Sequence, residues 1–329
     1  MRIFNQNRNR NDIYLLNDMC KIDEYSACMR CENPRCKKIN DDSIKIEKIK
    51  YFSYDKDFDV CPVDALQKND NGDLSIDDKK CILCGLCSYF CPISAIKLSN
   101  FKMTINNERN NNEYLSVPNS YKNIQKQEKQ LSKLYKIKSL SNIIENESMF
   151  NIIYNRIKMM PSTEHNKLAR NLLIGVGAKC VYPRKGDVAN RMDGIFEIKD
   201  NIGVIEVEFG ADSLSTSRGL LDDVAMLHYK QNIPVNKINA LSVMLELPNE
   251  RQDYWNVIHD VYKITGLKIN TITIGALLIL LWNGRKICLN NNKYFLSSIN
   301  KSLRKGIEDE IGRKLYIEQG YLGIFEPEK

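Results

Sequence analysis

Residues 81–92 read CILCGLCSYFCP, which places four cysteines within eleven residues and a proline directly after the last of them. Three thiolates within seven residues can occupy three corners of one iron-sulfur cube, whereas the fourth, Cys91, points to a neighbouring cluster. A zinc site usually takes two separated pairs of ligands, so this spacing argues against zinc. The stretch therefore predicts iron-sulfur binding in the N-terminal part of the chain.

A second group of cysteines lies upstream and is interrupted. Cys28, Cys31 and Cys36 follow a similar spacing, and Cys61 is followed by the same proline. Between them stand the 24 residues 37–60, where an uninterrupted motif has three. We expect this insertion, rich in Lys, Asp and Tyr, to form a surface excursion.

The peptides CMRCENPRC, CPVDAL and DKKCILCGLCSYFCPISAI resemble the dicluster ferredoxin modules of multisubunit oxidoreductases. The resemblance covers residues 28–97 and departs from that family at the insertion. It implies an α+β module with two [4Fe-4S] clusters and crossed ligation. One cluster is then held by Cys28, Cys31, Cys36 and Cys91, and the other by Cys81, Cys84, Cys87 and Cys61.

Three of the eleven cysteines, Cys20, Cys180 and Cys288, fall outside these motifs, and we expect small buried or incidental thiols there. The N-terminus carries no charged-then-apolar signal sequence, so we expect reduced thiols and a cytoplasmic protein. The longest apolar run, residues 272–282, is shorter than the ~18 to 20 residues of a membrane-spanning helix. We predict a buried strand there and no membrane association.

The chain is too long for one ordinary domain of ~150 residues. We expect a ferredoxin domain at 1–100, a linker and helical connector at 101–160, and an α/β domain at 161–329. Within the connector, residues 104–121 are polar, and 122–147 have the apolar periodicity of an amphipathic helix. Residues 1–120 carry 18 Lys and Arg against 18 Asp and Glu, so the net charge of +7 lies beyond them. This excess permits a polyanionic partner without requiring one.

The order of elements after Pro161 follows from apolar periodicity and turn residues. A helix begins near Pro161 and ends at Gly175 and Gly177. The remaining predictions are strands at 179–183, 194–199 and 202–209, a helix at 218–230, a strand at 238–247, a helix at 249–264 and a strand at 270–282. The core is thus predicted as α-β-β-β-α-β.

Two carboxylates, Glu206 and Glu208, lie two residues apart on a predicted strand, so their side chains leave the same face. The two carboxylates repel each other. A divalent cation bound by them and by Asp193 of the adjacent strand would compensate for this repulsion. Glu164 on the preceding helix is a candidate fourth oxygen donor. Taken singly, each has a plainer explanation, because Glu206 and Glu208 could line the wet face of an edge strand and Asp193 could belong to a turn.

Together with the element order, these residues resemble the PD-(D/E)XK, or restriction-endonuclease-like, nuclease superfamily over residues 161–247. The resemblance implies Mg²⁺ or Mn²⁺ bound by Asp193 and Glu206. Glu208 stands where most members have Lys, which puts the general-base role in doubt. Glu208, or a metal-bound hydroxide near it, would then activate the attacking water. Arg218 and Lys230 on the following helix are candidate phosphate contacts, although each is more often a solvated helix charge.

The leading hypothesis is a metal-dependent nuclease, with DNA as the expected substrate and a ferredoxin module that is structural or redox-regulatory. The alternative is an electron-transfer protein whose C-terminal domain docks onto a redox partner. A third hypothesis makes that domain a nucleic-acid-binding module without catalysis. The expected partners are nucleic acid, an electron donor or acceptor protein, and a second copy of the chain.

Overall fold

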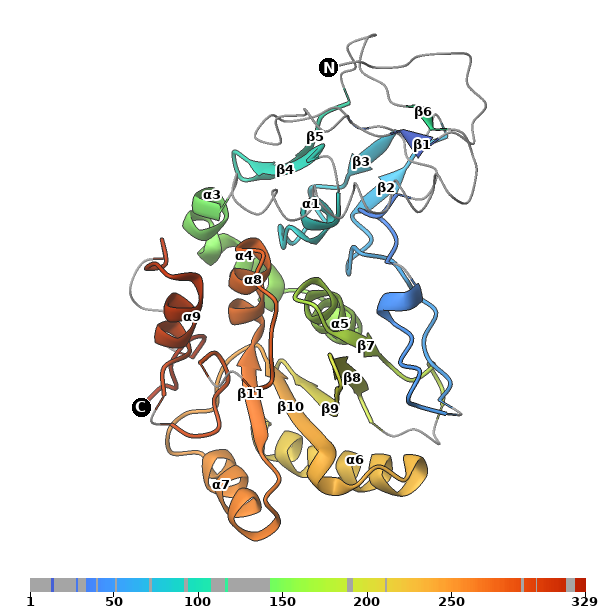
Figure 1. Ribbon diagram of the computed structural model, residues 1–329. Coiled ribbons are helices and arrows are strands. Elements are labelled where there is room, and N and C mark those ends of the chain that lie inside the picture. Colours follow the sequence, from blue (N-terminus) through green and yellow to red (C-terminus); the bar gives the residue numbers. More distant parts are fainter. Residues whose placement is uncertain are drawn as a thin grey trace. The chain divides into compact units, whose positions relative to one another are not determined.

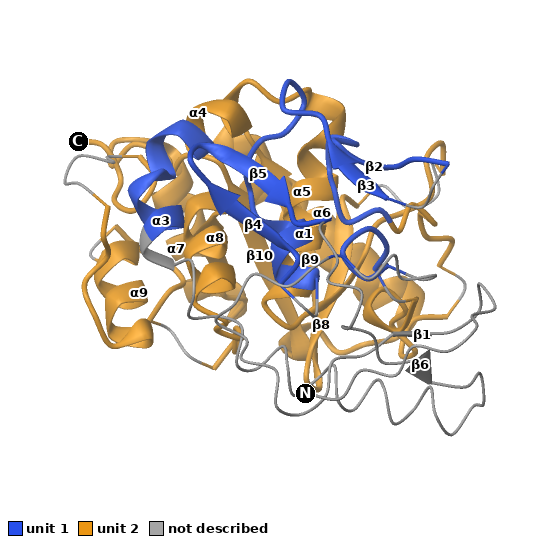
Figure 2. Ribbon diagram, turned by 90° about the horizontal axis from the view of Figure 1, so that it is seen from above, with its two compact units in different colours: residues 1–39, 59–153 blue, residues 40–58, 154–329 orange. Residues whose placement is uncertain are grey.

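The chain forms two compact units, described here from a computed structural model (Figure 1). The described residues are 13–14, 28, 34–39, 41–50, 52–70, 73–91, 94–107, 116–117, 143–187, 192–210, 212–290, 293–299, 301–317 and 323–329. Residues 1–39 and 59–153 make up unit 1, and residues 40–58 and 154–329 make up unit 2 (Figure 2). Most of the predicted insertion at 37–60 is therefore part of the C-terminal unit.

Unit 1 contains short elements arranged as two-stranded antiparallel sheets, β1 with β6, β2 with β3 and β4 with β5. Their bounds are β1 Ile13–Tyr14, β2 Leu66–Lys68, β3 Leu74–Ile76, α1 Leu86–Phe90, β4 Ile96–Ser99, β5 Lys102–Ile105, β6 Ser116–Val117 and α3 Ile143–Ser148. Helix α1 begins inside the cysteine motif, after Gly85. This glycine has a φ of 78°, a left-handed conformation that residues with a Cβ rarely adopt.

The elements of unit 2 follow the predicted order from α5 to β11. They are η1 Asp41–Ser43, α4 Phe150–Lys158, which begins in unit 1, η3 Ser162–Glu164, α5 His165–Gly175, β7 Lys179–Val181, β8 Gly194–Ile198, β9 Asn201–Glu208, α6 Ser213–Gln231, η4 Val235–Lys237, β10 Ile238–Met244, α7 Asp253–Thr265, β11 Ile269–Thr273, α8 Ile274–Trp282 and α9 Leu303–Ile311. The run α5-β7-β8-β9-α6-β10 has the predicted α-β-β-β-α-β order.

The strands of unit 2 form one five-stranded mixed sheet in the order β11-β10-β9-β8-β7. β7, β8 and β9 are an antiparallel meander, whereas β10 runs parallel to β9 and β11 parallel to β10. A parallel connection needs a crossover, which α6 supplies between β9 and β10. β9 is therefore a central strand, and this excludes the edge-strand explanation for its carboxylates.

Helices cover both faces of this sheet. Figure 1 shows α5 and α8 above the strands in that view and α6 and α7 below them. All residues of β8 and β11 are buried, which requires cover on both sides. The sheet thus positions the ends of β8 and β9 between α5 and α6.

The apolar run at 272–282 corrects one prediction. β11 ends at Thr273, and Ile274–Trp282 form helix α8 rather than a continued strand. The Thr273 side chain caps the helix by accepting a hydrogen bond from the Ala276 backbone N–H at 3.2 Å. A helix buried on every side has no polar face, so its sequence carries no 3.6-residue periodicity that would separate it from a strand.

Other boundaries shift by a few residues. Helix α6 begins at Ser213 rather than 218, because Asp212 caps it by accepting from the Ser215 backbone N–H at 3.2 Å. The predicted linker at 104–121 overlaps strand β5 at its start. The amphipathic helix predicted at 122–147 falls mostly outside the described residues, which resume with α3. Among the described helices none is both long and apolar enough to span a membrane.

Candidate metal centres

Four cysteines of unit 1 lie close together around α1. Burial raises the pKa of Cys84, and the neighbouring thiols of Cys61 and Cys81 raise it further. The pKa of Cys87 is raised by burial and then by Cys84, Cys81 and Cys61. This quartet is the ligand set that the ferredoxin resemblance implies for one cluster. Iron binds thiolates and neutralises their charge, so it would relieve this crowding.

The other predicted cluster is described in part. Cys28, Cys36 and Cys91 are buried, and Cys36 lies near enough to raise the pKa of Cys87. Their fourth partner, Cys31, lies outside the described residues, as does Cys20. Of the two remaining cysteines, Cys180 is buried in β7 and Cys288 is half-buried.

In unit 2, the sheet register brings two predicted carboxylates together. Gly194 pairs with Ile205 across the antiparallel β8–β9 ladder, so Asp193 stands opposite Glu206. The Asp193 carboxylate accepts hydrogen bonds from the Val207 backbone N–H at 3.0 Å and from the Asn166 amide at 3.4 Å. Burial raises the pKa of Glu206 to about 10, and Asp193 contributes next. The two groups therefore share one crowded, poorly hydrated position.

A third carboxylate, Asp223 of α6, joins this pair. Asp223 is 2% exposed and also raises the pKa of Glu206, with which it forms a side-chain hydrogen bond. Helix α6 approaches closely here, because a Cβ on Gly219 would lie 2.7 Å from a Glu206 carboxylate oxygen. The sequence analysis missed Asp223. Its signal was its place on the apolar stripe of Leu220, Val224 and Leu227, where a carboxylate is unexpected.

The other predicted site residues lie apart from this cluster. The Glu208 carboxylate accepts a hydrogen bond from the Gly210 backbone N–H and so turns toward the following loop. Glu164 accepts from the Thr163 hydroxyl at 3.4 Å. Arg218 is exposed on α6. Lys230 lies eleven residues beyond Gly219, about 16 Å along the helix.

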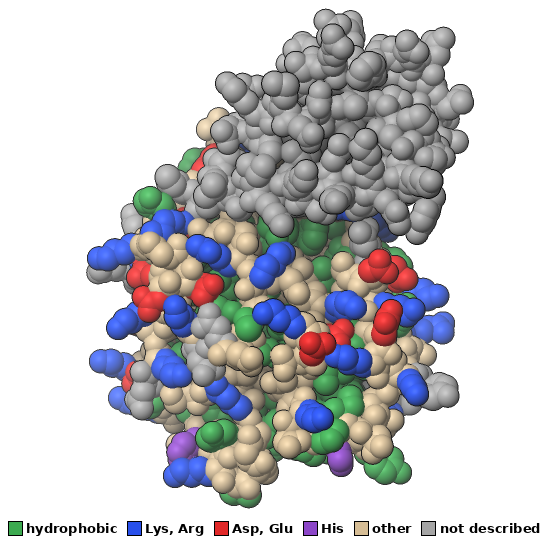
Figure 3. All heavy atoms as spheres, in the orientation of Figure 1, with side chains coloured by type: hydrophobic (Ala, Val, Ile, Leu, Met, Phe, Trp, Pro, Cys, Tyr) green, Lys and Arg blue, Asp and Glu red, His purple; other side chains and the backbone are tan. Residues whose placement is uncertain are grey.

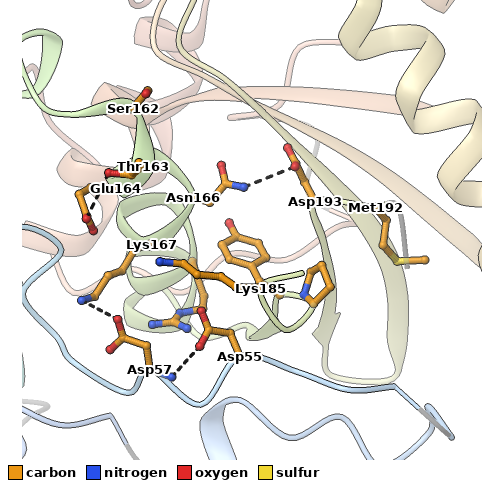
Figure 4. A pocket seen from close by; sticks show the side chains of 13 residues that line it. Asp55, Asp57, Ser162, Thr163, Glu164, Asn166, Lys167, Lys185, Met192 and Asp193 are labelled. Carbon is orange, nitrogen blue, oxygen red and sulfur yellow. Dashed lines mark hydrogen bonds and ion pairs between the residues drawn. The ribbon is translucent and has the colours of Figure 1, made fainter. Parts of the chain in front are cut away.

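A cavity of about 270 Å³ opens beside Asp193 within unit 2 (Figure 4). Its lining includes Glu164 and the buried Arg170 of α5, and two residues of the inserted segment, Asp55 and Asp57. Neither η3 nor α5 has a side-chain cap on its first N–H groups. η3 leads directly into α5, since the His165 backbone N–H donates to the Ser162 carbonyl.

The donor sets fit two kinds of metal. Among the described residues, no three Cys, His, Asp or Glu side chains converge as they would around one ion. An iron-sulfur cluster does not need such convergence, since each of its four cysteines binds a different iron. The carboxylates offer only oxygen, which suits Mg²⁺ or Mn²⁺. A cation would also displace the proton that Glu206 otherwise keeps.

Comparison with known proteins addresses the cysteine module. Residues 74–97 match the 4Fe-4S binding domain family. An uncharacterized ferredoxin of Methanocaldococcus jannaschii is 37% identical over 73 residues, which are 22% of this chain and 34% of that protein. The chain therefore spans about a third of the length of this curated relative. The N-terminal part is a ferredoxin-like module that binds a [4Fe-4S] cluster.

Proposed function

We propose that the protein is a metal-dependent nuclease that carries a two-cluster ferredoxin module. The observation that carries this proposal is the carboxylate pair Asp193 and Glu206 at the end of the antiparallel β8–β9 ladder. Its setting supports the same function, because the α5-β7-β8-β9-α6-β10 run matches the core order of the PD-(D/E)XK superfamily.

The chain's own groups divide the work of binding and positioning. Asp193, Glu206 and Asp223 would supply the oxygen ligands of a divalent cation, and the bound cation would act as a Lewis acid and lower the pKa of a bound water. The exposed Arg218 of α6 is the candidate phosphate contact. Glu208 does not fill the place of the usual Lys, since its carboxylate faces the Gly210 backbone.

Nucleic acid is the proposed substrate class, and DNA is our choice within it. Figure 3 shows Lys and Arg side chains scattered over the displayed face of unit 2 rather than gathered in one patch. Scattered cations give weak, salt-dependent binding along a phosphate backbone rather than a tight groove. We therefore expect affinity to fall steeply with salt.

The test uses the cluster-loaded full chain under anaerobic conditions. Plasmid and single-stranded DNA are incubated with Mg²⁺ or Mn²⁺, beside Asp193→Asn and Glu206→Gln. We expect each substitution to reduce cleavage by about 100-fold or more, the scale of losing a metal ligand or its support. Asp253→Asn, an exposed carboxylate on α7, is the matched control and should cleave normally. Cleavage that survives in both site variants rejects the proposal.

A second candidate function is electron transfer without hydrolysis. It is favoured by the comparisons, because the matched family is a 4Fe-4S binding domain and the relative is named a ferredoxin. In that case unit 2 would dock a redox partner. Absence of cleavage on every nucleic acid, together with rapid oxidation of the reduced clusters by an acceptor protein, would favour this function.

A further inference from the structure

The two ends of the segment inserted between Cys36 and Cys61 contact each other, and we call these contacts the neck. Lys38 and Asp59 face each other in an antiparallel bridge, and their side chains form an ion pair at 2.7 Å. The Val60 backbone N–H donates to the Lys37 carbonyl at 2.8 Å. The neck therefore joins the two ends of the insertion within one or two residues of both cysteines.

Beyond the neck, the insertion packs as part of unit 2. Tyr54 forms an antiparallel bridge with Pro183, just past the edge strand β7. The Asp55 backbone N–H donates to the Tyr182 carbonyl, and the Arg184 backbone N–H donates to the Ser53 carbonyl, both at 2.9 Å. The insertion thus extends the sheet at its edge, where unpaired backbone groups would otherwise meet water.

Side chains hold the same segment at two further points. Lys48 forms an ion pair with Glu197 of β8 at 2.8 Å, and this carboxylate raises the pKa of Lys48. Gln231, at the end of α6, accepts from the Lys50 backbone N–H at 2.9 Å and donates to the Lys50 carbonyl at 2.8 Å. Both ties lie at the end of the β8–β9 ladder that carries the turn, opposite the end with Asp193 and Glu206.

The segment also forms one wall of the cavity beside Asp193. The Asp57 carboxylate pairs with Lys167 of α5 at 2.9 Å, and Lys167 is only 11% exposed (Figure 4). The Asp55 carboxylate accepts the Asp57 backbone N–H at 2.9 Å, which fixes the turn. If the segment left, it would uncover Lys167 and open the cavity on that side.

We propose that cluster assembly controls this cavity through the inserted segment. Iron bound at Cys36 and Cys61 fixes the neck, and the fixed neck keeps Ser53–Asp57 against β7 and α5. Loss of iron frees both ends of the segment, which raises the entropy gained on undocking and loosens the cavity wall. The catalytic consequence rests on the proposed function, whereas the structural coupling does not.

Hydrogen exchange of the full chain tests the coupling without nucleic acid. The cluster-loaded protein is compared with the same protein after iron is removed by a chelator under anaerobic conditions. We expect the amides of Asp55 and Arg184 to exchange about tenfold faster or more without iron, while β9 and β10 keep their protection. Equal exchange in the two states overturns the proposal, as does loss of protection throughout unit 2.

A docking variant separates the segment from the clusters themselves. Lys48→Gln removes the ion pair with Glu197, and Lys158→Gln is its matched control, because Lys158 pairs with Glu246 at 2.9 Å with a similar side-chain exposure. We expect Lys48→Gln alone to speed exchange at Asp55 with the cluster absorbance unchanged. Equal exchange in both variants contradicts the proposed docking. A protein that shows the coupling but cleaves nothing would reject only the nuclease.

Discussion

Asp193 stands opposite Glu206 across the β8–β9 ladder, and Glu206 also contacts Asp223 of helix α6. Glu206 thus interacts with one carboxyl group from a loop and with another from a helix. Without a cation, the free energy of the folded chain is raised by ionising them all. This arrangement makes their charge state the first property to test.

We predict that Glu206→Gln stabilises the protein in the absence of Mg²⁺ and Mn²⁺ at neutral and higher pH. In the folded chain Glu206 keeps its proton up to a pKa of about 10, whereas its ordinary value is 4.5. The folded state therefore binds more protons within this window, and the free energy of unfolding falls as pH rises. Gln has no proton to lose, so we expect a gain on the order of 1 to 3 kcal/mol at pH 8 and little at pH 4.5.

Anaerobic urea unfolding at these two pH values measures the effect. Glu208→Gln is the control, because the Glu208 carboxylate faces the Gly210 backbone rather than the other carboxylates. Added Mg²⁺ should stabilise the wild type and leave Glu206→Gln little changed. The same pH dependence in wild type and Glu206→Gln would show that Glu206 is not crowded.

We predict that Asp223→Asn weakens Mg²⁺ binding and that Asp222→Asn does not. The two residues are neighbours on α6, but Asp223 is 2% exposed whereas Asp222 faces solvent. Of these two aspartates, Asp223 contacts Glu206, so Asp223→Asn should raise the Kd for Mg²⁺ about tenfold or more. Calorimetric titration of the cluster-loaded chain gives the Kd. Equal effects of the two substitutions on the Kd would show that Asp223 is not part of the metal site.

We predict that Cys61→Ser lowers the iron content and Cys288→Ser does not. Cys61 lies beside Cys84 and Cys87, whereas Cys288 belongs to unit 2. Two [4Fe-4S] clusters hold about eight irons per chain, so losing one cluster should leave about four. Iron analysis after anaerobic purification decides the number. About four irons per chain in the wild type would mean that the protein holds a single cluster.

We predict that Leu280→Ala and Leu281→Ala each destabilise the protein by about 2 to 5 kcal/mol. Both side chains are fully buried in helix α8. Ile264→Ala on α7 is the control, because that side chain is 83% exposed and should change the stability by less than about 0.5 kcal/mol. Urea midpoints measure all three. A small effect at either leucine would contradict the burial of α8 on every side.

The local elements could be predicted because their signals are short-range. The two strands predicted at 194–199 and 202–209 lie within one residue of β8, Gly194–Ile198, and β9, Asn201–Glu208. The alternation of Glu206, Val207 and Glu208 was likewise a property of one strand. Helix α8 was missed because a uniformly apolar segment carries no period, and only its surroundings decide its conformation.

By itself, the sequence determined the iron-sulfur module, because cysteine spacing is a local geometric constraint on one cofactor. It also determined the α-β-β-β-α-β order. Only the tertiary structure decided that Asp223 meets Glu206 and that the insertion joins unit 2. These contacts join residues far apart in the chain, and their stability comes from burial and pairing that no local pattern records.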